Sequence, residues 1–177
     1  MRIHGLGYVA AGAVLVVLVS VGCSRPVDTA TYGVRQMGER VEVGPLIVSV
    51  LEAEWLAQLG DGPGARLPQN RFLLLRVSIT NSGGTGISVP GMVLEHPNGQ
   101  TYAELSEGEN VENWLPPIRT VAPAETRDGR IAFDAPPSAY KLRIREEADF
   151  SNDAAKDRSV LIDIPLNLQA PVRVPAK

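Results

Sequence analysis

The sequence predicts an all-β domain, and three observations predict it. Short segments in which apolar and polar residues alternate with a period of two recur from Val41 to Ile164, and helical periodicity is nearly absent. Turn residues separate these segments, which is typical of a β-sandwich or a β-barrel. With 177 residues the chain is long enough for about one domain with its own core, and its single cysteine, Cys23, leaves that core without an internal disulfide.

The first half of the domain supplies two long strands. Residues 46–55 alternate with a register change near Val50, where we expect a β-bulge. Residues 71–81 form the clearest strand, with one face toward the core and the other mostly toward water. Its inward residues are Leu73, Leu75, Val77 and Ile79.

The start of that second strand carries an additional signal. Phe72 and Leu74 make its first half apolar on both faces. The preceding loop, residues 56–69, is rich in Gly and Pro and is predicted to be exposed. We therefore expect this loop to cover the outer face of the strand where it begins.

The second half of the domain adds a hairpin and three strands. Asn98-Gly99 between two short apolar segments predicts a hairpin with a type I′ turn, because both residues accept a positive φ. Alternation then predicts strands at residues 129–135, 140–145 and 160–164. The tail, residues 168–177, contains Pro171 and Pro175 and is expected to be frayed.

The N-terminal segment indicates export. Arg2 precedes an uncharged apolar run, and small or compact residues lie directly before Cys23. This segment resembles a bacterial lipoprotein signal peptide, although Ser20 stands where Leu is usual. The resemblance implies that Cys23 becomes the N-terminus and carries a diacylglycerol thioether and an acyl chain such as palmitate. An uncleaved membrane-spanning helix and ordinary secretion are the alternatives.

These signals divide the chain into four parts. We expect a signal peptide in residues 1–22, a flexible lipidated tether in residues 23–38, a β-sandwich in residues 39–167 and the C-terminal tail. The protein is then anchored in the cell membrane or the outer membrane and faces the extracytoplasmic side. Ser24 follows the cysteine where Asp favours inner-membrane retention in the lipoproteins that the chain resembles, which inclines the prediction toward the outer membrane.

A family resemblance specifies the fold further. The segments LIVSVLEAEW, RFLLLRVSITNSG, MVLEHPNGQTY and VAPAETRDGRIAFDAP together resemble a family of bacterial secreted and lipid-anchored proteins of unknown function, similar to the immunoprotective extracellular antigen. The resemblance implies an immunoglobulin-like antiparallel β-sandwich without established catalytic residues. Ala124 stands where the family usually has Gly after the proline, so the turn is expected to differ there.

Composition and motifs argue against several functions. A net charge of −3 offers no basic surface for nucleic acid. His96 is the only histidine after Cys23, which excludes histidine-rich zinc sites and leaves one candidate base for a catalytic triad. Ser138 and Lys141 match the S-x-x-K motif of penicillin-recognising enzymes, but they enter a predicted strand instead of a helix. We therefore predict no enzymatic activity and no cofactor.

Three candidate interaction features remain. The acidic loop of residues 104–113 is either a cation site or a solvated loop. Trp114 is either a core side chain or part of a contact surface. Lys141, Arg143 and Arg145 form an outward basic row, which is either a patch for an acidic partner or lipid headgroup or a solvated sheet face.

Two classes of function follow from these features. The first is a non-catalytic envelope module that presents a surface or sheet edge to a protein or peptidoglycan partner. The second is an envelope carrier or sensor that binds a small ligand or cation between the sheets or in the acidic loop. An exposed apolar patch would favour the first, and an enclosed pocket with converging polar groups would favour the second.

Overall fold

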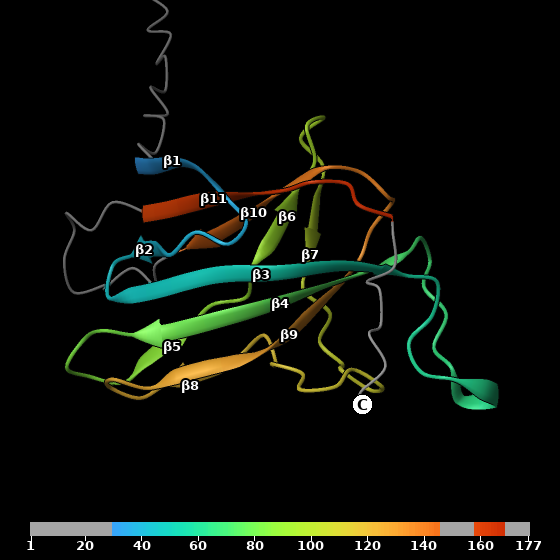
Figure 1. The fold of residues 1–177 in the computed structure, drawn as a ribbon, viewed down its shortest axis with the longest axis horizontal. Coiled ribbons are helices and arrows are strands. Elements are labelled where there is room, and N and C mark those ends of the chain that lie inside the picture. The colour runs from blue at the N-terminus through green and yellow to red at the C-terminus, as the bar shows by residue number, and fades with distance from the viewer. Residues whose placement is uncertain (1–29, 146–157, 169–177) are drawn as a thin grey trace, which may run out of the picture.

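The computed structural model describes residues 30–145 and 158–168, which form two packed β-sheets and a small third sheet (Figure 1). Sheet A has the strand order β1 (Ala30–Gln36), β11 (Arg158–Ile164), β10 (Tyr140–Arg145), β6 (Val93–Glu95) and β7 (Thr101–Ala103). Sheet B has the order β2 (Val41–Val43), β3 (Leu46–Leu56), β4 (Phe72–Asn81) and β9 (Thr126–Asp134). The third sheet pairs β5 (Ile87–Val89) with β8 (Arg119–Val121). The predicted β-sandwich is confirmed.

The central pair of sheet B follows the predicted alternation. β3 and β4 are antiparallel from Leu46↔Asn81 to Leu56↔Phe72, and their register shifts between Val50 and Glu52. The predicted β-bulge is therefore present. Because of its extra residue, the inward and outward alternation after the bulge again matches the two faces of sheet B.

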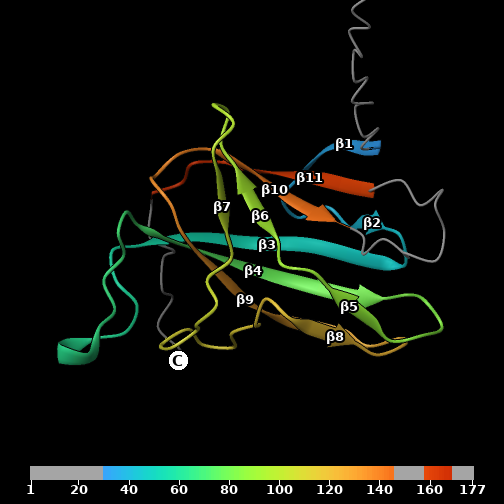
Figure 2. The same ribbon diagram turned by 180° about the vertical axis from the view of Figure 1, so that it is seen from behind.

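The main core lies between the sheets, because both sheets direct every second residue inward. In Figure 1 the strands β1 and β11 of sheet A lie above sheet B, and Figure 2 shows β6 and β7 from the other side of the sandwich. The fully buried side chains include Leu73, Leu75, Ile79, Leu94, Ile131, Phe133, Leu142, Ile144 and Ile162.

A second group of apolar side chains, here called the outer cluster, packs on the opposite face of sheet B. Phe72, Leu74 and Ala132 form its floor. The loop after β3, which includes the short 3-10 helix η1 (Gly62–Gly64), supplies Leu59, and the acidic loop supplies Val111. The expected cover over β4 is thus present, but two loops supply it instead of one.

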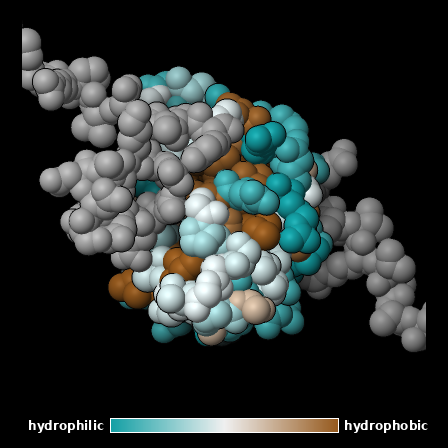
Figure 3. Space-filling model, turned by 90° about the vertical axis from the view of Figure 1, so that its left-hand side faces the viewer, coloured by the Kyte–Doolittle hydropathy of each residue, from teal (hydrophilic) through white to brown (hydrophobic). Residues whose placement is uncertain are grey.

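Hydrophobic side chains also reach the surface. Seen from the end of the sandwich where β2 and the β4–β5 loop lie, hydrophobic residues show between hydrophilic ones (Figure 3). The large exposed hydrophobic residues among those described are Val34, Leu51, Leu67, Ile118, Leu166 and Leu168. Single exposed apolar residues of this kind are normal on soluble proteins.

The expected tether is partly a strand. β1 lies within residues 23–38 and pairs in parallel with β11 at the edge of sheet A. Its register shifts between Thr31 and Val34, where Gly33 has a φ of +74°. That glycine interrupts the alternation, which explains why the sequence pattern did not show this strand.

The hairpin between β6 and β7 is confirmed, but its predicted turn type is wrong. Of the two turn residues, only Gly99 has a positive φ, at +89°, whereas a type I′ turn needs two such residues. Gly99 N–H donates to His96 O at 2.9 Å. Pro97, which fixes φ near −65°, takes the second position of a type I turn, and Gly99 follows in the left-handed region.

The turn before β9 is tied to the end of β4 through Asn81. Its buried amide donates to Thr85 O at 2.7 Å and to Val121 O at 2.9 Å, and its backbone carbonyl accepts from Ala124 N–H at 3.0 Å. Ala124 has a φ of +58°, a conformation that glycine adopts without strain. The departure from the family at this position therefore places an alanine in a glycine conformation.

Several expectations fall on residues outside the described ones. They are the signal peptide, the lipidated Cys23 and the tail beyond Leu168. Within the described ranges, no helix has the length and apolar character needed to span a bilayer.

Candidate functional site

The structure brings His96 and Ser138 together, with His96 Nε2 3.0 Å from Ser138 Oγ. The backbone N–H of Asn98 donates to His96 Nδ1 at 3.2 Å, so Nδ1 is an acceptor, and the proton of the neutral ring lies on Nε2. Nε2 therefore donates to the serine instead of removing its proton. A general base needs the reverse arrangement, with an acceptor holding the Nδ1 proton, so this geometry does not activate Ser138.

The acidic loop begins with a buried ion pair that the sequence did not suggest. Glu104 Oε1 lies 2.7 Å from Arg119 Nη2, and the two side chains are 2% and 0% exposed. Glu104 Oε1 also accepts from the backbone N–H of Met92 at 2.6 Å, and Arg119 Nη1 donates to Pro116 O at 2.9 Å. These contacts occupy the carboxylate of Glu104, which is therefore not available as a ligand for a cation in the acidic loop.

The rest of the acidic loop lacks the arrangement of a cation site. Glu107 lies 3.9 Å from Arg66, and Glu109 and Glu112 are exposed. Among the described residues, no group of three or more His, Cys, Asp or Glu side chains is placed to hold a metal ion. The loop instead packs Val111 and Leu105 against the outer cluster.

Trp114 is half-buried at the border of the outer cluster. It forms an isolated bridge with Arg130 in β9. A side chain added at Gly108 would lie 1.8 Å from the Trp114 ring, so this glycine lets the acidic loop close over the indole. The contacts of Trp114 in the structure are those of packing.

The basic row lies on the outer face of β10, as its alternation with buried residues predicted. Its middle member, Arg143, is paired: its guanidinium donates to both carboxylate oxygens of Glu95 and to Ser159 Oγ at 2.8 Å. The hydrogen bond to Glu95 raises the pKa of Arg143. Lys141 lies between Glu95 and Asp163 in the strand register. The acids beside the row therefore offset its charge.

The strongest candidate site is a groove on the outer face of sheet B. Its first opening, of about 290 Å³, lies beside β3 and is lined by Met37, Glu52, Ala53, Glu54, Arg130, Pro165 and Asn167. Its second opening, of about 500 Å³, lies beside the outer cluster and is lined by residues 56–61, Leu74, Asn110, Glu112 and Arg130. Arg130 is common to both openings, which we call together the outer groove.

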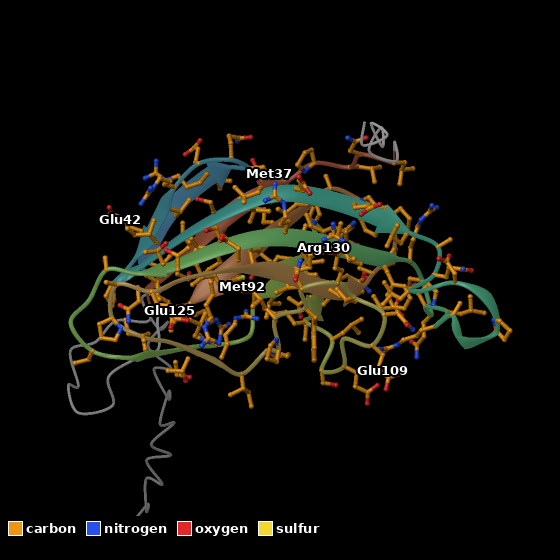
Figure 4. The ribbon with its side chains drawn as sticks, turned by 60° about the horizontal axis from the view of Figure 1, so that its bottom comes forward. Met37, Glu42, Met92, Glu109, Glu125 and Arg130 are labelled. Atoms are coloured by element: carbon orange, nitrogen blue, oxygen red, sulfur yellow. The ribbon has the colours of Figure 1, made fainter. Side chains whose placement is uncertain are left out.

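Local structure fixes the position of Arg130. Its backbone N–H donates to Asn113 O at 2.8 Å, and its carbonyl accepts from Leu115 N–H at 2.8 Å. A side chain added at Gly129 would lie 2.5 Å from Asn113 O, so the loop approaches β9 this closely only at a glycine. Figure 4 shows Arg130 on the outer face of the sheet, with Met37 beyond β3.

The charged side chains on the outer face of sheet B differ in whether they are paired. Glu52, Arg76 and Arg130 lie side by side across β3, β4 and β9. Arg76 Nη2 donates to Glu52 Oε1 at 2.7 Å, and this hydrogen bond lowers the pKa of Glu52, with a smaller contribution from the charge of Arg130. Among the described residues, the Arg130 guanidinium has no hydrogen-bond partner.

The groove can therefore bind a polar chain. Four carboxylates line it, those of Glu52, Glu54, Asp61 and Glu112, against the guanidinium of Arg130. Carboxylates attract cationic groups, and a guanidinium donates in a fixed fork to carbonyl or carboxylate oxygens. The strand predicted at residues 129–135 contains Arg130, but the sequence could not indicate the groove, because loops distant in sequence form its walls.

Solved structures of low sequence identity share this fold. The yjhA protein from Bacillus subtilis is 19% identical with a TM-score of 0.57, over 73% of this chain and 98% of that one. A functionally unknown protein from Listeria monocytogenes is 9% identical with a TM-score of 0.57, over 75% and 84%. A candidate lipoprotein, ycdA, from Bacillus subtilis is 13% identical with a TM-score of 0.52, over 72% of this chain and 38% of that one.

The family itself comes from the sequence. No curated protein matches the chain. A family model described as a domain of unknown function, DUF4352, matches residues 35–156, which is more than half of the chain and extends from β1 to the segment before β11. The chain therefore belongs to the DUF4352 family.

Proposed function

We propose that the protein is a lipid-anchored, non-catalytic binding module on the extracytoplasmic side of the cell envelope, and that its partner binds in the outer groove. One observation carries the choice of surface. The interior between the sheets is filled by fully buried side chains, whereas the outer groove presents Arg130, whose guanidinium has no hydrogen-bond partner among the described residues, beside four carboxylates.

The chemistry of the groove favours a protein partner with a basic extended segment. Its carboxylates would hold lysine or arginine side chains, and Arg130 would hold backbone carbonyls of the segment. An envelope protein meets this description best. Crosslinking to peptidoglycan, whose peptides also carry amines, is the competing outcome of the test below.

The anchor is proposed from the sequence. The apolar N-terminal run followed by Cys23 supports it, and one structural neighbour is described as a candidate lipoprotein. Replacing Cys23 with alanine should abolish labelling by a palmitate analogue in growing cells, while Ser24→Ala should keep it. Label that persists in the Cys23 variant would show that another residue carries the lipid and would favour an uncleaved membrane helix.

The partner surface is tested by photo-crosslinking in intact cells. A photoreactive residue at Ala57, which lines the groove, should give a discrete crosslinked protein that the same residue at Ala103, on the outer face of sheet A, does not give. Arg130→Glu should remove this product. Arg127→Glu, on the same strand but outside the groove lining, should keep it.

Other results of this experiment would reject the groove as the partner surface. Identical products from both crosslinker positions would mean that the contact lies elsewhere on the sandwich. Adducts to peptidoglycan alone, unaffected by Arg130→Glu, would replace the protein partner with the cell wall.

A further inference from the structure

We propose that residues 169–177 of this same chain bind in the outer groove and compete there with the partner. The competition rests on the proposed function, but the intramolecular contact does not. Three features support the contact: the position at which the described chain ends, the charge of this segment and the hydrogen-bonding groups of the groove.

The described chain ends at the mouth of the groove. After β11 leaves sheet A, Pro165 and Asn167 line the first opening, and Leu168 follows with 54% of its side chain exposed. In extended polyproline conformation the next nine residues span roughly 28 Å, at about 3.1 Å per residue. Because neighbouring strands lie about 4.8 Å apart, this length suffices to pass Arg130 and reach the second opening.

Charge distinguishes this segment from the others that lie outside the structure. Its sequence, QAPVRVPAK, contains Arg173 and Lys177 and no acidic residue. Residues 146–157 contain five acidic residues and one lysine, so the carboxylates of the groove repel them. Residues 24–29 contain one residue of each charge. Among residues 24–29, 146–157 and 169–177, only the last segment complements a groove lined by four carboxylates.

The backbone chemistry also matches. Pro171 and Pro175 favour an extended chain whose carbonyl groups have no internal hydrogen bonds. The guanidinium of Arg130, common to both openings, supplies donors for such carbonyls. Val172 and Val174 flank Arg173, so the segment carries apolar and cationic side chains next to each other, as suits an opening lined by Leu74 together with Asp61 and Glu112.

Tethering makes the contact effective even when it is weak. A segment that starts at the groove mouth has a local concentration in the millimolar range, so a millimolar affinity suffices to keep the groove about half occupied. A partner must then displace the segment. The apparent affinity of the partner is its intrinsic affinity multiplied by the fraction of grooves that the segment leaves empty. The segment would act as a built-in competitor.

Hydrogen exchange tests the contact on the full chain in detergent. Ending the chain after Leu168 keeps every described strand and should speed exchange in residues 56–61 and 110–112 several-fold. Adding the peptide QAPVRVPAK should restore protection in the truncated protein. The peptide should bind more weakly to the full chain, because the chain's own segment competes for the groove. The same peptide carrying Arg173→Glu and Lys177→Glu should bind at least tenfold more weakly.

A matched pair of groove variants locates the site. Glu112→Lys should weaken binding of the peptide to the truncated protein several-fold, because Glu112 lines the second opening. Glu109→Lys, in the same loop but outside the groove lining, should leave it unchanged (Figure 4). Equal effects of the two variants, or exchange that does not depend on the segment, would overturn the proposal.

The two proposals fail separately. Protection by the segment without any crosslinked partner would retain the intramolecular contact and reject the proposed function. A crosslinked partner at Ala57 in equal amount with and without residues 169–177 would retain the partner surface and reject the competition.

Discussion

The two faces of β4 are buried by different means. Its inner residues, such as Leu75, pack between two sheets whose registers are fixed by hydrogen-bonded ladders. Its outer residues are buried only at the start of the strand, where Phe72 and Leu74 lie under loops. Further along, Arg76 faces solvent. The difference teaches that strand alternation builds the interior, whereas loop packing decides how much of the outer face stays open, and the outer groove lies where the cover ends.

The largest effect is expected at Leu75. Its side chain is 0% exposed and lies between Ala53 of β3 and Ile131 of β9. Leu75→Ala removes buried apolar surface and leaves a cavity, which typically costs about 2–5 kcal/mol. Denaturant unfolding of the chain from Arg25 to Lys177 measures the loss. A cost below about 1 kcal/mol would mean that the interior is not packed between ladders.

A smaller loss is expected at Leu74, on the other face. Its side chain is 4% exposed, but loops that can settle into the vacated space form its cover. We expect Leu74→Ala to cost about 2 kcal/mol, at the lower end for buried leucine. Hydrogen exchange should also show faster opening of residues 56–61 than of β4. If Leu74→Ala costs more than Leu75→Ala, the contrast between the faces is reversed.

The interior should also respond to alkaline pH through Tyr140. Burial raises the pKa of Tyr140 to about 12, and nearby Tyr102 contributes. Because the folded-state pKa is the higher one, the stabilisation by the neutral phenol is complete below about pH 10 and is lost as pH rises toward about 12. Tyr140→Phe, which removes the hydrogen bond to Pro136 O, should cost about 1 kcal/mol at pH 7.

The difference between wild type and Tyr140→Phe isolates this group from the other titrating residues. Unfolding at several pH values should show that difference shrinking between about pH 10 and pH 12. A difference that is constant across this range would place the phenol in contact with solvent.

Ala124 separates backbone strain from packing, because its side chain is exposed. Glycine at its φ of +58° should stabilise the protein by roughly 0.5–1 kcal/mol. Ala122→Gly, in the same turn but without a positive φ, should be neutral or destabilising. Thermal unfolding of the two variants gives the comparison. Destabilisation by both glycines would show that the turn carries no strain.

The smallest effect is expected at Arg76. Its ion pair with Glu52 is exposed, with side chains 41% and 58% accessible, so Arg76→Ala should cost about 0.5 kcal/mol or less. Unfolding in low and high salt measures this small contribution. A cost equal to that of Leu75→Ala would mean that the outer face of β4 is as tightly packed as the inner one.

The sequence predicted the parts of the fold that depend on alternation. Both long strands of sheet B and the bulge near Val50 are visible as a period of two and a change in its phase. β1 was assigned to the tether because Gly33 interrupts it and a parallel partner from the far end of the chain stabilises it. The hairpin turn was misread because the turn is centred on Pro97 and Asn98 instead of Asn98 and Gly99, and proline fixes the first of these central positions at a negative φ.

The candidate site was harder to predict. The buried pair Glu104–Arg119 looks in the sequence like two ordinary surface charges, since burial of a charge leaves no periodic signal. The outer groove joins β3, β9, two loops and the segment after β11. The sequence predicted the strand that carries Arg130, but only the tertiary structure shows which distant residues meet there.

The parallel edge strand β1 has a mechanical consequence for an anchored protein. If Cys23 carries the proposed lipid, residues 24–29 alone separate the anchor from Ala30, and tension between the membrane and a bound partner would enter the sandwich at the first residue of β1. The register shift divides the pairing of β1 with β11 into a short part at Ala30 and Thr31 and a longer part from Val34 to Gln36. In such an anchored protein we expect the short part to yield first under load and to lengthen the link by roughly 13 Å, at about 3.3 Å per released residue, before the main core opens.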